Sequence, residues 1–309
     1  MKYTKNSTYD RARKFIYRNA RPLDLARFRY QFEGGGKEDI LTALAAYQND
    51  DGGFGNALEA DFWNPNSSPM QTSYAIGILR EINFTDCTHS VISGILRYLN
   101  SGASFDGRVW HRTIPSNNDY PHAQWWHYEK DEKFLYNPTA AIIGFLLLCG
   151  ISKGNPMYQT ALRLAGEAIE YYLKSANIEF HEIGCFVELL GDMEKAGVTN
   201  ISGFAAFREK VIKDASGAIE KDSSKWEHTY CCKPSQLIKS RSSILYKNNE
   251  SLCNSECGLI IKTQLESGEW AVTWRWEKYP AEFAVSANWW QSVAAIGNLM
   301  YLKELGRLE

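Results

Sequence analysis

The sequence predicts an all-α protein made of about five or six helix pairs. Apolar residues recur at helical spacing along most of the chain, one helical pattern occurs three times, and one glycine turn recurs between helices. Alternation of the kind typical of strands is rare. Helices are therefore expected over residues 7–18, 39–47, 70–82, 90–99, 138–149, 158–173, 182–196, 204–219, 255–264 and 289–305.

Proline and glycine mark several of the expected helix ends. Pro138 and Pro156 lie where helices begin, a position that tolerates proline because the first backbone N–H groups lack partners within the helix. Gly150 and Gly197 lie where helices stop, and glycine is common just past the last helical turn. The connectors are short and rich in Asn, Ser, Asp and Gly, which favour turns.

One helical pattern occurs three times along the chain. The copies read Thr72-Ser-Tyr-Ala-Ile-Gly77-Ile-Leu79, Thr139-Ala-Ala-Ile-Ile-Gly144-Phe-Leu146 and Ser292-Val-Ala-Ala-Ile-Gly297-Asn-Leu299. Each copy has a hydroxyl residue five positions before its glycine. A glycine inside a helix costs about 1 kcal/mol relative to alanine. Its recurrence in one frame predicts that another helix packs closely against each of these glycines.

A glycine turn precedes two of these helices. It reads Gln48-Asn-Asp-Asp-Gly-Gly-Phe54 in one place and Gln264-Leu-Glu-Ser-Gly-Glu-Trp270 in the other. A weaker version, Asp106-Gly-Arg-Val-Trp110, lacks the glutamine. The repeating unit of helix, turn, loop and helix spans roughly 50–60 residues. Helix pairs of this kind either stack into an open solenoid or close into a ring.

The stretch Gln48-Asn-Asp-Asp-Gly-Gly-Phe-Gly55 resembles the Gln/Trp repeat of squalene–hopene cyclases and protein prenyltransferase β subunits. In that superfamily the glutamine caps a helix end and the aromatic residue stacks behind it. The resemblance implies one α/α toroid over residues 1–309, a ring of helix pairs around a central cavity. It also implies an enzyme acting on a prenyl or terpenoid-type substrate.

Two further stretches resemble motifs of an uncharacterised bacterial family that is often described as prenyltransferase-like. They read Gly52-Gly-Phe-Gly-Asn-Ala-Leu-Glu-Ala-Asp61 and Ser116-Asn-Asn-Asp-Tyr-Pro-His-Ala-Gln-Trp-Trp126. That description rests on fold, and a fold does not determine a function.

The motifs that carry chemistry in the superfamily are absent from the sequence. Class II cyclases protonate an alkene with an Asp-x-Asp-Asp motif, and none occurs here. Protein prenyltransferases hold zinc with an Asp-x-Cys pair and a distant histidine, whereas Asp86-Cys87-Thr88-His89 has those residue types at the wrong spacing. No catalytic residue is therefore carried over from the superfamily.

Polar and aromatic residues concentrate in residues 106–129, a loop between two repeats. Loops carry many ligand-contacting groups, and aromatic faces bind cations or stack on sugar rings. The segment supplies two catalytic candidates, Asp119 and His122, and six substrate-binding candidates, His111, Arg112, Asn118, Trp125, Trp126 and His127. In the alternative interpretation, the two tryptophans are buried anchors of a long loop whose polar residues face solvent.

Two other segments follow the glycine turns. Glu59 and Asp61 come after the first turn and are candidates for an acid/base pair. The alternative is a turn whose carboxylates bind backbone N–H groups. After the second turn, Trp274, Arg275 and Trp276 are candidates for substrate binding and Glu277 for catalysis, with a purely structural aromatic seam as the alternative. In a ring, these equivalent segments would share a rim.

Three classes of function remain open. The first is an enzyme for a prenyl or terpenoid-type substrate, on the resemblance. The second is a carbohydrate-active enzyme, a lyase or glycosidase, because helical toroids also serve such enzymes and tryptophan platforms suit sugars. The third is a non-catalytic binding or scaffold protein. A small molecule in the central cavity is the expected ligand in the first two.

The net charge, the polarity of the N-terminus and the number of cysteines limit the possible partners and location of the protein. The net charge of −2, without a run of like charges, argues against a nucleic-acid partner. The N-terminus is polar and the apolar runs are short, which predicts neither a signal peptide nor a membrane span. Seven cysteines, an odd number, suggest reduced thiols in the cytoplasm.

No cofactor is expected from the motifs of the chain. Residues His228, Cys231, Cys232, Cys253 and Cys257 were weighed as zinc ligands, but no Cys-x-x-Cys pair is present. The sequence therefore predicts no metal site, with zinc as the alternative, and it does not indicate an oligomeric state.

Overall fold

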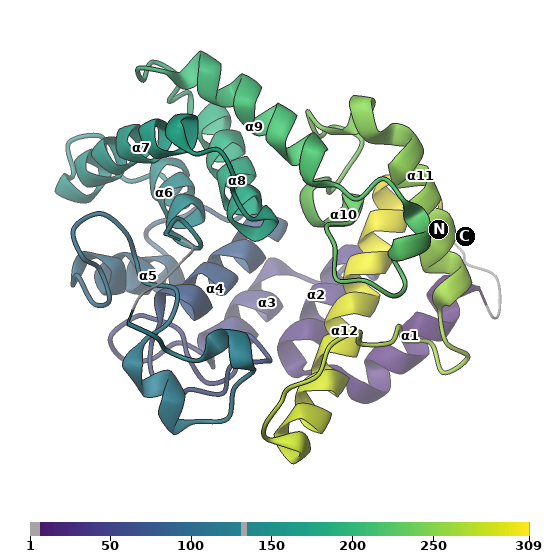
Figure 1. Cartoon of the computed structure of the whole chain (residues 1–309). Coiled ribbons are helices and arrows are strands. Elements are labelled where there is room, and N and C mark those ends of the chain that lie inside the picture. Colours follow the sequence, from purple (N-terminus) through teal and green to yellow (C-terminus); the bar gives the residue numbers. More distant parts are fainter. Residues whose placement is uncertain (1–6, 131–134, 309) are drawn as a thin grey trace. The chain divides into compact units, whose positions relative to one another are not determined.

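The computed structural model describes residues 7–130 and 135–308. Within these ranges the chain forms twelve α-helices and three short 3-10 helices, and its extended pairing is limited to isolated bridges (Figure 1). The all-α prediction is confirmed. The α-helices are α1 Thr8–Asn19, α2 Pro22–Phe32, α3 Lys37–Ala45, α4 Pro69–Glu81, α5 Ser90–Asn100, α6 Thr139–Leu148, α7 Pro156–Lys174, α8 Phe180–Ala196, α9 Phe204–Ala218, α10 Pro234–Leu237, α11 Tyr246–Thr263 and α12 Pro280–Glu304.

The chain divides into two compact units. The first unit joins Met1–Ala46 to Ser216–Glu309, and the second is Tyr47–Ala215. The first is therefore made of two segments that are far apart in the sequence, and the second is one continuous segment. The expected single domain, the ring of helix pairs and its central cavity stay predictions.

The second unit is built around α6. The described side chains of this helix from Thr139 to Leu147 are all buried, so the helix has no polar face. A helix that is apolar all round must be covered on every side. Helices α4, α7 and α8 pack against it (Figure 1). Gly144 permits the approach of α8, because a Cβ at this position would lie 3.0 Å from the Cα of Leu189.

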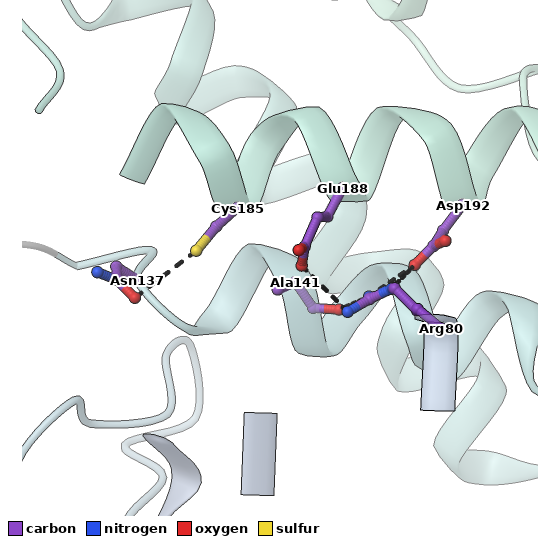
Figure 2. A network of polar contacts seen from close by, with 6 residues as sticks. All are labelled: Arg80, Asn137, Ala141, Cys185, Glu188 and Asp192. Carbon is purple, nitrogen blue, oxygen red and sulfur yellow. Dashed lines mark hydrogen bonds and ion pairs between the residues drawn. The ribbon is translucent and has the colours of Figure 1, made fainter. Parts of the chain in front are cut away.

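A charged network crosses this core. Figure 2 shows Arg80 of α4 reaching α8, where its Nε lies 2.8 Å from Asp192 Oδ2 and its Nη1 lies 3.1 Å from Glu188 Oε2. Arg80 Nη2 also donates to the carbonyl of Ala141 in α6. The side chain of Asp192 is 3% exposed, so its charge depends on Arg80 for compensation.

The first unit packs α12 against α1, α2 and α11. A buried ion triad lies within α2 and its N-cap. Arg21 Nε and Arg27 Nη1 donate to the two oxygens of Asp24, at 2.8 and 3.1 Å. Neighbours three residues apart share one face of a helix, so one carboxylate can pair with both guanidinium groups. The guanidinium of Arg21 also lies 5.3 Å from the ring centroid of Trp289 in α12.

The two glycine turns have the same hydrogen bonds. Gln48 Nε2 donates to the carbonyls of Gly52 and Val91, both at 2.9 Å. Gln264 Nε2 donates in the same way to Gly268 and to Thr8, again at 2.9 Å. In each case the second acceptor lies in the first turn of another helix, α5 or α1. Each glutamine thus ties its own turn to the first turn of a helix in the same unit.

Glycine is required in both turns. Gly52 and Gly268 have φ values of +94° and +109°, in the region that favours glycine. A Cβ would lie 2.1 Å from the carbonyl oxygen of Gly94 in one turn and 2.2 Å from that of Arg11 in the other. These carbonyls belong to the same helices, α5 and α1, that accept from the glutamines.

In two copies of the helical pattern, the hydroxyl residue accepts a hydrogen bond from the backbone N–H of the aromatic residue in the preceding turn. Phe54 N–H donates to Thr72 Oγ1 at 3.1 Å, and Trp110 N–H donates to Thr139 Oγ1 at 2.9 Å. The degenerate turn at Trp110 therefore uses the same anchor as the turn at Phe54.

Several expectations about the helices were wrong. Close packing of another helix was expected at all three repeated glycines. It is found at Gly144, but an added Cβ at Gly77 or Gly297 would have nothing within 4 Å. Helices α11 and α12 begin well before the predicted starts at residues 255 and 289. The sequence pattern missed these starts because polar and aromatic residues interrupt the apolar spacing in the first turns of both helices. Helices α2 and α10 were not expected, although both start with proline.

Candidate functional site

The predicted site residues of the second unit lie on two loops that pair with each other. These paired loops, residues 56–66 and 110–128, meet at a bridge between Phe62 and His122. Trp63 N–H donates to the carbonyl of Pro121 at 3.0 Å, and Ala123 N–H donates to that of Asp61 at 2.9 Å. The pairing brings the backbone of Asp61 against that of Ala123, the residue after His122, although the two loops are far apart in the sequence.

The two carboxylates of the first loop are buried. Glu59 is 6% exposed and Asp61 is 2% exposed. Glu59 Oε2 accepts the N–H of Asp61 at 3.0 Å, and the Glu59 carbonyl accepts the N–H of Phe62 at 3.2 Å. Glu59 therefore makes the backbone contact that the turn interpretation expected. Burying two carboxylates is costly, so the surrounding structure must compensate both charges.

His122 is buried between a carbonyl and a second histidine. Its Nδ1 lies 2.6 Å from the Tyr120 carbonyl oxygen, and its Nε2 lies 3.2 Å from Nδ1 of His127. The two rings stack, with centroids 5.4 Å apart and an interplanar angle of 20°. His122 is 8% exposed, whereas His127 is an exposed residue. The structure thus brings together two of the predicted residues as a hydrogen-bonded pair.

Trp126 packs between an aromatic ring and a cation. Its ring stacks on Phe62 at a centroid distance of 5.9 Å, and the guanidinium of Arg112 lies 5.4 Å from its centroid. It is 8% exposed, and its Nε1 has no hydrogen-bond partner among the described residues. An aromatic ring with a cation at its face is a stable arrangement, so Trp126 anchors its loop, as the structural alternative proposed.

Three buried amides that the sequence analysis did not select hold the loops together. Asn64 Nδ2 donates to Asn117 Oδ1 at 3.1 Å, and Asn117 Nδ2 donates to the Trp126 carbonyl at 2.8 Å. Gln71 in α4 donates to the Asn64 carbonyl at 3.0 Å and accepts the Leu58 N–H at 2.9 Å. All three are completely buried. Asparagine is common in turns, so nothing in the sequence separates such a buried amide from an exposed one.

The other predicted site residues of the second loop differ in their exposure and in their hydrogen bonds. Asp119 is exposed, at the end of the 3-10 helix Pro115–Asp119. The Asn118 side chain accepts the Tyr128 N–H at 2.8 Å and donates to the Tyr128 carbonyl at 3.2 Å. His111 and Trp125 are half-buried. Asn118 thus has a structural role in the loop, whatever its part in binding.

The four candidates after the second glycine turn belong to the first unit. Arg275 and Glu277 are exposed, and Trp276 is buried against Phe283 with ring centroids 5.9 Å apart. Trp274 makes an edge-to-face contact with Trp290 at 5.6 Å. These aromatic contacts fit the seam expected in the structural alternative. The shared rim with the paired loops stays a prediction.

A shallow polar depression lies beside the first glycine turn. It has a volume of about 530 Å³ and is lined by Gln48, Asn49, Asp50, Asp51, Asn56, Pro65, Asn66 and Ser67. None of the predicted site residues lines it. Asp51 Oδ1 accepts the Gly53 N–H at 2.9 Å and the Ser67 hydroxyl at 2.6 Å, so this carboxylate serves the turn.

Within residues 7–130 and 135–308, no group of three or more His, Cys, Asp or Glu side chains is arranged to hold a metal ion. All seven cysteines are free thiols. Burial raises the pKa of Cys257 to about 11 and that of Cys149 to about 12, so both are protonated at neutral pH. Among the helices described, none has the length and apolar character that crossing a membrane requires.

Comparison with known proteins adds no relative. No protein-family model matches the chain, and no curated protein or solved structure matches it significantly. The functional argument therefore rests on the residues of the paired loops.

Proposed function

We propose that this chain is an enzyme that performs acid–base chemistry on a polar cyclic molecule, such as a sugar unit, at the paired loops. The observation that carries the proposal is that the paired loops hold both a buried carboxylate, Asp61, and the hydrogen-bonded pair His122 and His127. Carboxylates and imidazoles are the usual proton-transfer groups of enzymes. Their concentration on loops that rigid helices hold in place is typical of active sites.

The polarity of the loops favours a polar ligand. Arg112, Asn118 and Glu59 add charged and amide groups to the same paired loops. A hydrocarbon offers no hydrogen bond in exchange for the water that polar groups lose on binding, at a cost of about 1–3 kcal/mol for each group left unsatisfied. A sugar ring instead offers hydroxyl groups to them. This class corresponds to a lyase or a glycosidase, in which one group removes a proton and another donates one.

A prenyl or terpenoid-type substrate is the second candidate. The shared geometry of the turns at Gln48 and Gln264 favours it, because the glutamine ties a helix end as in the superfamily that these turns resemble. The same resemblance supports a ring of helix pairs with a central cavity in one domain. A cytoplasmic location belongs to this proposal and rests on the odd number of cysteines.

The experiment is an activity screen of the purified full chain. Oligosaccharides and uronic-acid polysaccharides are offered in parallel with prenyl diphosphates, and products are detected by mass spectrometry. Asp61→Asn and Glu59→Gln keep the shape of each carboxylate and remove its charge. Glu188→Gln is the matched control, because this partly exposed glutamate lies on α8, away from the loops.

The outcomes separate the candidates. Turnover of a polysaccharide that Asp61→Asn reduces by about 10²–10⁴-fold, with Glu188→Gln unchanged, supports the proposal. Turnover of prenyl diphosphates alone supports the second candidate. Turnover that survives both carboxylate variants contradicts the assignment of the site.

A further inference from the structure

We infer that the proton-accepting atom of this site is Nε2 of His127, and that His122 is a positioning residue that fixes the tautomer of His127. The inference rests on the proposed function for its chemical meaning. Its structural content, the tautomer of each ring, is tested without any substrate. The sequence predicts a catalytic role for His122 and a binding role for His127, and the hydrogen bonds of the two rings exchange these roles.

The first step concerns the Tyr120 carbonyl. A carbonyl oxygen accepts hydrogen bonds and cannot donate them. The 2.6 Å contact with His122 Nδ1 therefore requires a hydrogen on that nitrogen. In a neutral imidazole only one nitrogen carries a hydrogen, so His122 Nε2 is an acceptor.

The second step concerns His127. Its Nδ1 lies 3.2 Å from His122 Nε2, within the range of an N–H···N hydrogen bond. Because His122 Nε2 accepts, His127 Nδ1 must carry the hydrogen. The lone pair of neutral His127 is then on Nε2. The neighbouring residue helps to fix this ring, since the backbone of Tyr128 is held by two hydrogen bonds to Asn118.

The third step is exposure. His122 is buried and both its nitrogens are engaged, so it cannot meet a ligand through either one. His127 is exposed, and its Nε2 makes no hydrogen bond with any residue in the described part of the chain. Of the two rings, His127 alone presents an accessible lone pair.

The reaction step follows from this arrangement. A substrate O–H or acidic C–H gives its proton to His127 Nε2, and the electron pair of the broken bond stays on the substrate. The imidazolium formed keeps its Nδ1–H bonded to His122 Nε2, and this bond becomes charge-assisted and stronger. The Tyr120 carbonyl holds His122 in place. The chain from carbonyl to His122 to His127 thus orients the base as the third group of a catalytic triad does.

The test is long-range ¹H–¹⁵N correlation spectroscopy of the full chain labelled with ¹⁵N-histidine, at a pH where the imidazoles are neutral. We expect both His122 and His127 to show a hydrogen on Nδ1. In His122→Phe the buried ring remains but its acceptor is gone, so His127 should shift towards a mixture of tautomers. In His127→Phe the Tyr120 contact is unaffected, so His122 should keep its Nδ1–H. His181→Gln on α8 is the control for assignment and folding.

Two results would overturn the inference. One is a His127 ring that carries its hydrogen on Nε2. The other is a His127 tautomer that does not change in a folded His122→Phe variant. If His122→Phe does not fold, the His127→Phe spectrum decides. A His122 ring without a hydrogen on Nδ1 could not donate to the Tyr120 carbonyl, and the inference would then be wrong.

Failure of the proposed function gives a different pattern. If both histidines show the expected tautomers but no substrate is turned over, the hydrogen-bond assignment stands and the enzymatic role of the loops is rejected. With a substrate, His127→Ala should lose about 10²–10⁴-fold in rate. Added imidazole should restore part of this loss, because it replaces the missing base. It should not restore His122→Ala, because the base is still present there but misoriented.

Discussion

Gln48 and Gln264 make the same two hydrogen bonds in different units of the chain. Each Nε2 donates to the glycine carbonyl four residues ahead and to a carbonyl in the first turn of a second helix. In both turns the glycine backbone also touches that second helix, one turn further along. A single glutamine thus closes its own turn and binds that turn to a helix of the same unit.

Removing either glutamine should destabilise its unit. Gln48→Ala and Gln264→Ala each leave two backbone carbonyls without their donor, and we expect a loss of about 1–3 kcal/mol in the free energy of unfolding. Chemical denaturation followed by circular dichroism measures the loss. The control is Gln159→Ala, since this exposed side chain donates to a single loop carbonyl. Equal midpoints for Gln48→Ala and Gln159→Ala would show that the tie contributes nothing.

Glycine-to-alanine exchange should have opposite effects in the turns and in the helices. Gly52→Ala and Gly268→Ala meet a backbone oxygen at 2.1 and 2.2 Å and should cost at least about 1–3 kcal/mol. Gly77→Ala and Gly297→Ala lie within helices in open space and should stabilise by up to about 1 kcal/mol. Thermal unfolding of the four variants gives the comparison. A stabilised Gly52→Ala would contradict the turn geometry.

The network around Arg80 should depend much more on Asp192 than on Glu188. Asp192→Ala leaves a guanidinium without its buried partner, and we expect a loss of about 3–5 kcal/mol. The side chain of Glu188 is 46% exposed, so Glu188→Ala should cost no more than about 1 kcal/mol. Urea denaturation of both variants tests the ratio. In the double variant Arg80→Met with Asp192→Leu, no charge remains buried, and stability should partly recover.

The buried carboxyl of Glu256 should make the stability of the first unit depend on pH. Burial raises its pKa above the ordinary value of 4.5, although hydrogen bonds from the Ser235 N–H and hydroxyl oppose the rise. A raised pKa means that the folded chain holds a proton that the unfolded chain has already lost. Stability is therefore highest at low pH for this group and falls as the pH rises from about 4.5 through the folded pKa.

Glu256→Gln removes that proton equilibrium. The stability of the variant relative to the wild type should therefore increase between pH 4.5 and pH 7, the starting value being the ordinary one for this group. Denaturation midpoints over this range give the measurement. Glu250→Gln on the exposed face of the same helix is the control and should run parallel to the wild type. A constant difference between Glu256→Gln and wild type would show that Glu256 does not titrate there.

The helices and the turns were largely predictable because they depend on local rules. Apolar spacing located α4, α5, α6, α8 and α9 to within a few residues, and Gly197 caps α8 with a φ of +69° as expected. The starts of α11 and α12 were missed because their first turns carry few periodic apolar residues. The repeated glycines failed as a guide to packing, since nothing local distinguishes Gly77 from Gly144.

The candidate site was predictable in composition but not in geometry. The sequence selected the loop of His122 and the turn of Asp61, yet it offered no reason to pair them. That pairing depends on the buried amides Asn64 and Asn117, which bond across the two loops. Such contacts arise from tertiary structure, and turn-forming residues do not reveal them. The direction of the bond between His122 and His127 likewise depends on a backbone carbonyl.

The division of the chain has a consequence for biosynthesis. Gln264 ties its turn to Thr8, so the first unit needs α1, which is made before the second unit, and α11 and α12, which are made after it. The second unit, Tyr47–Ala215, is complete in one stretch of the nascent chain. Domains fold as units while the ribosome moves along the message. The second unit can therefore fold first, whereas α1 and α2 can pack against α12 only after α12 has been made.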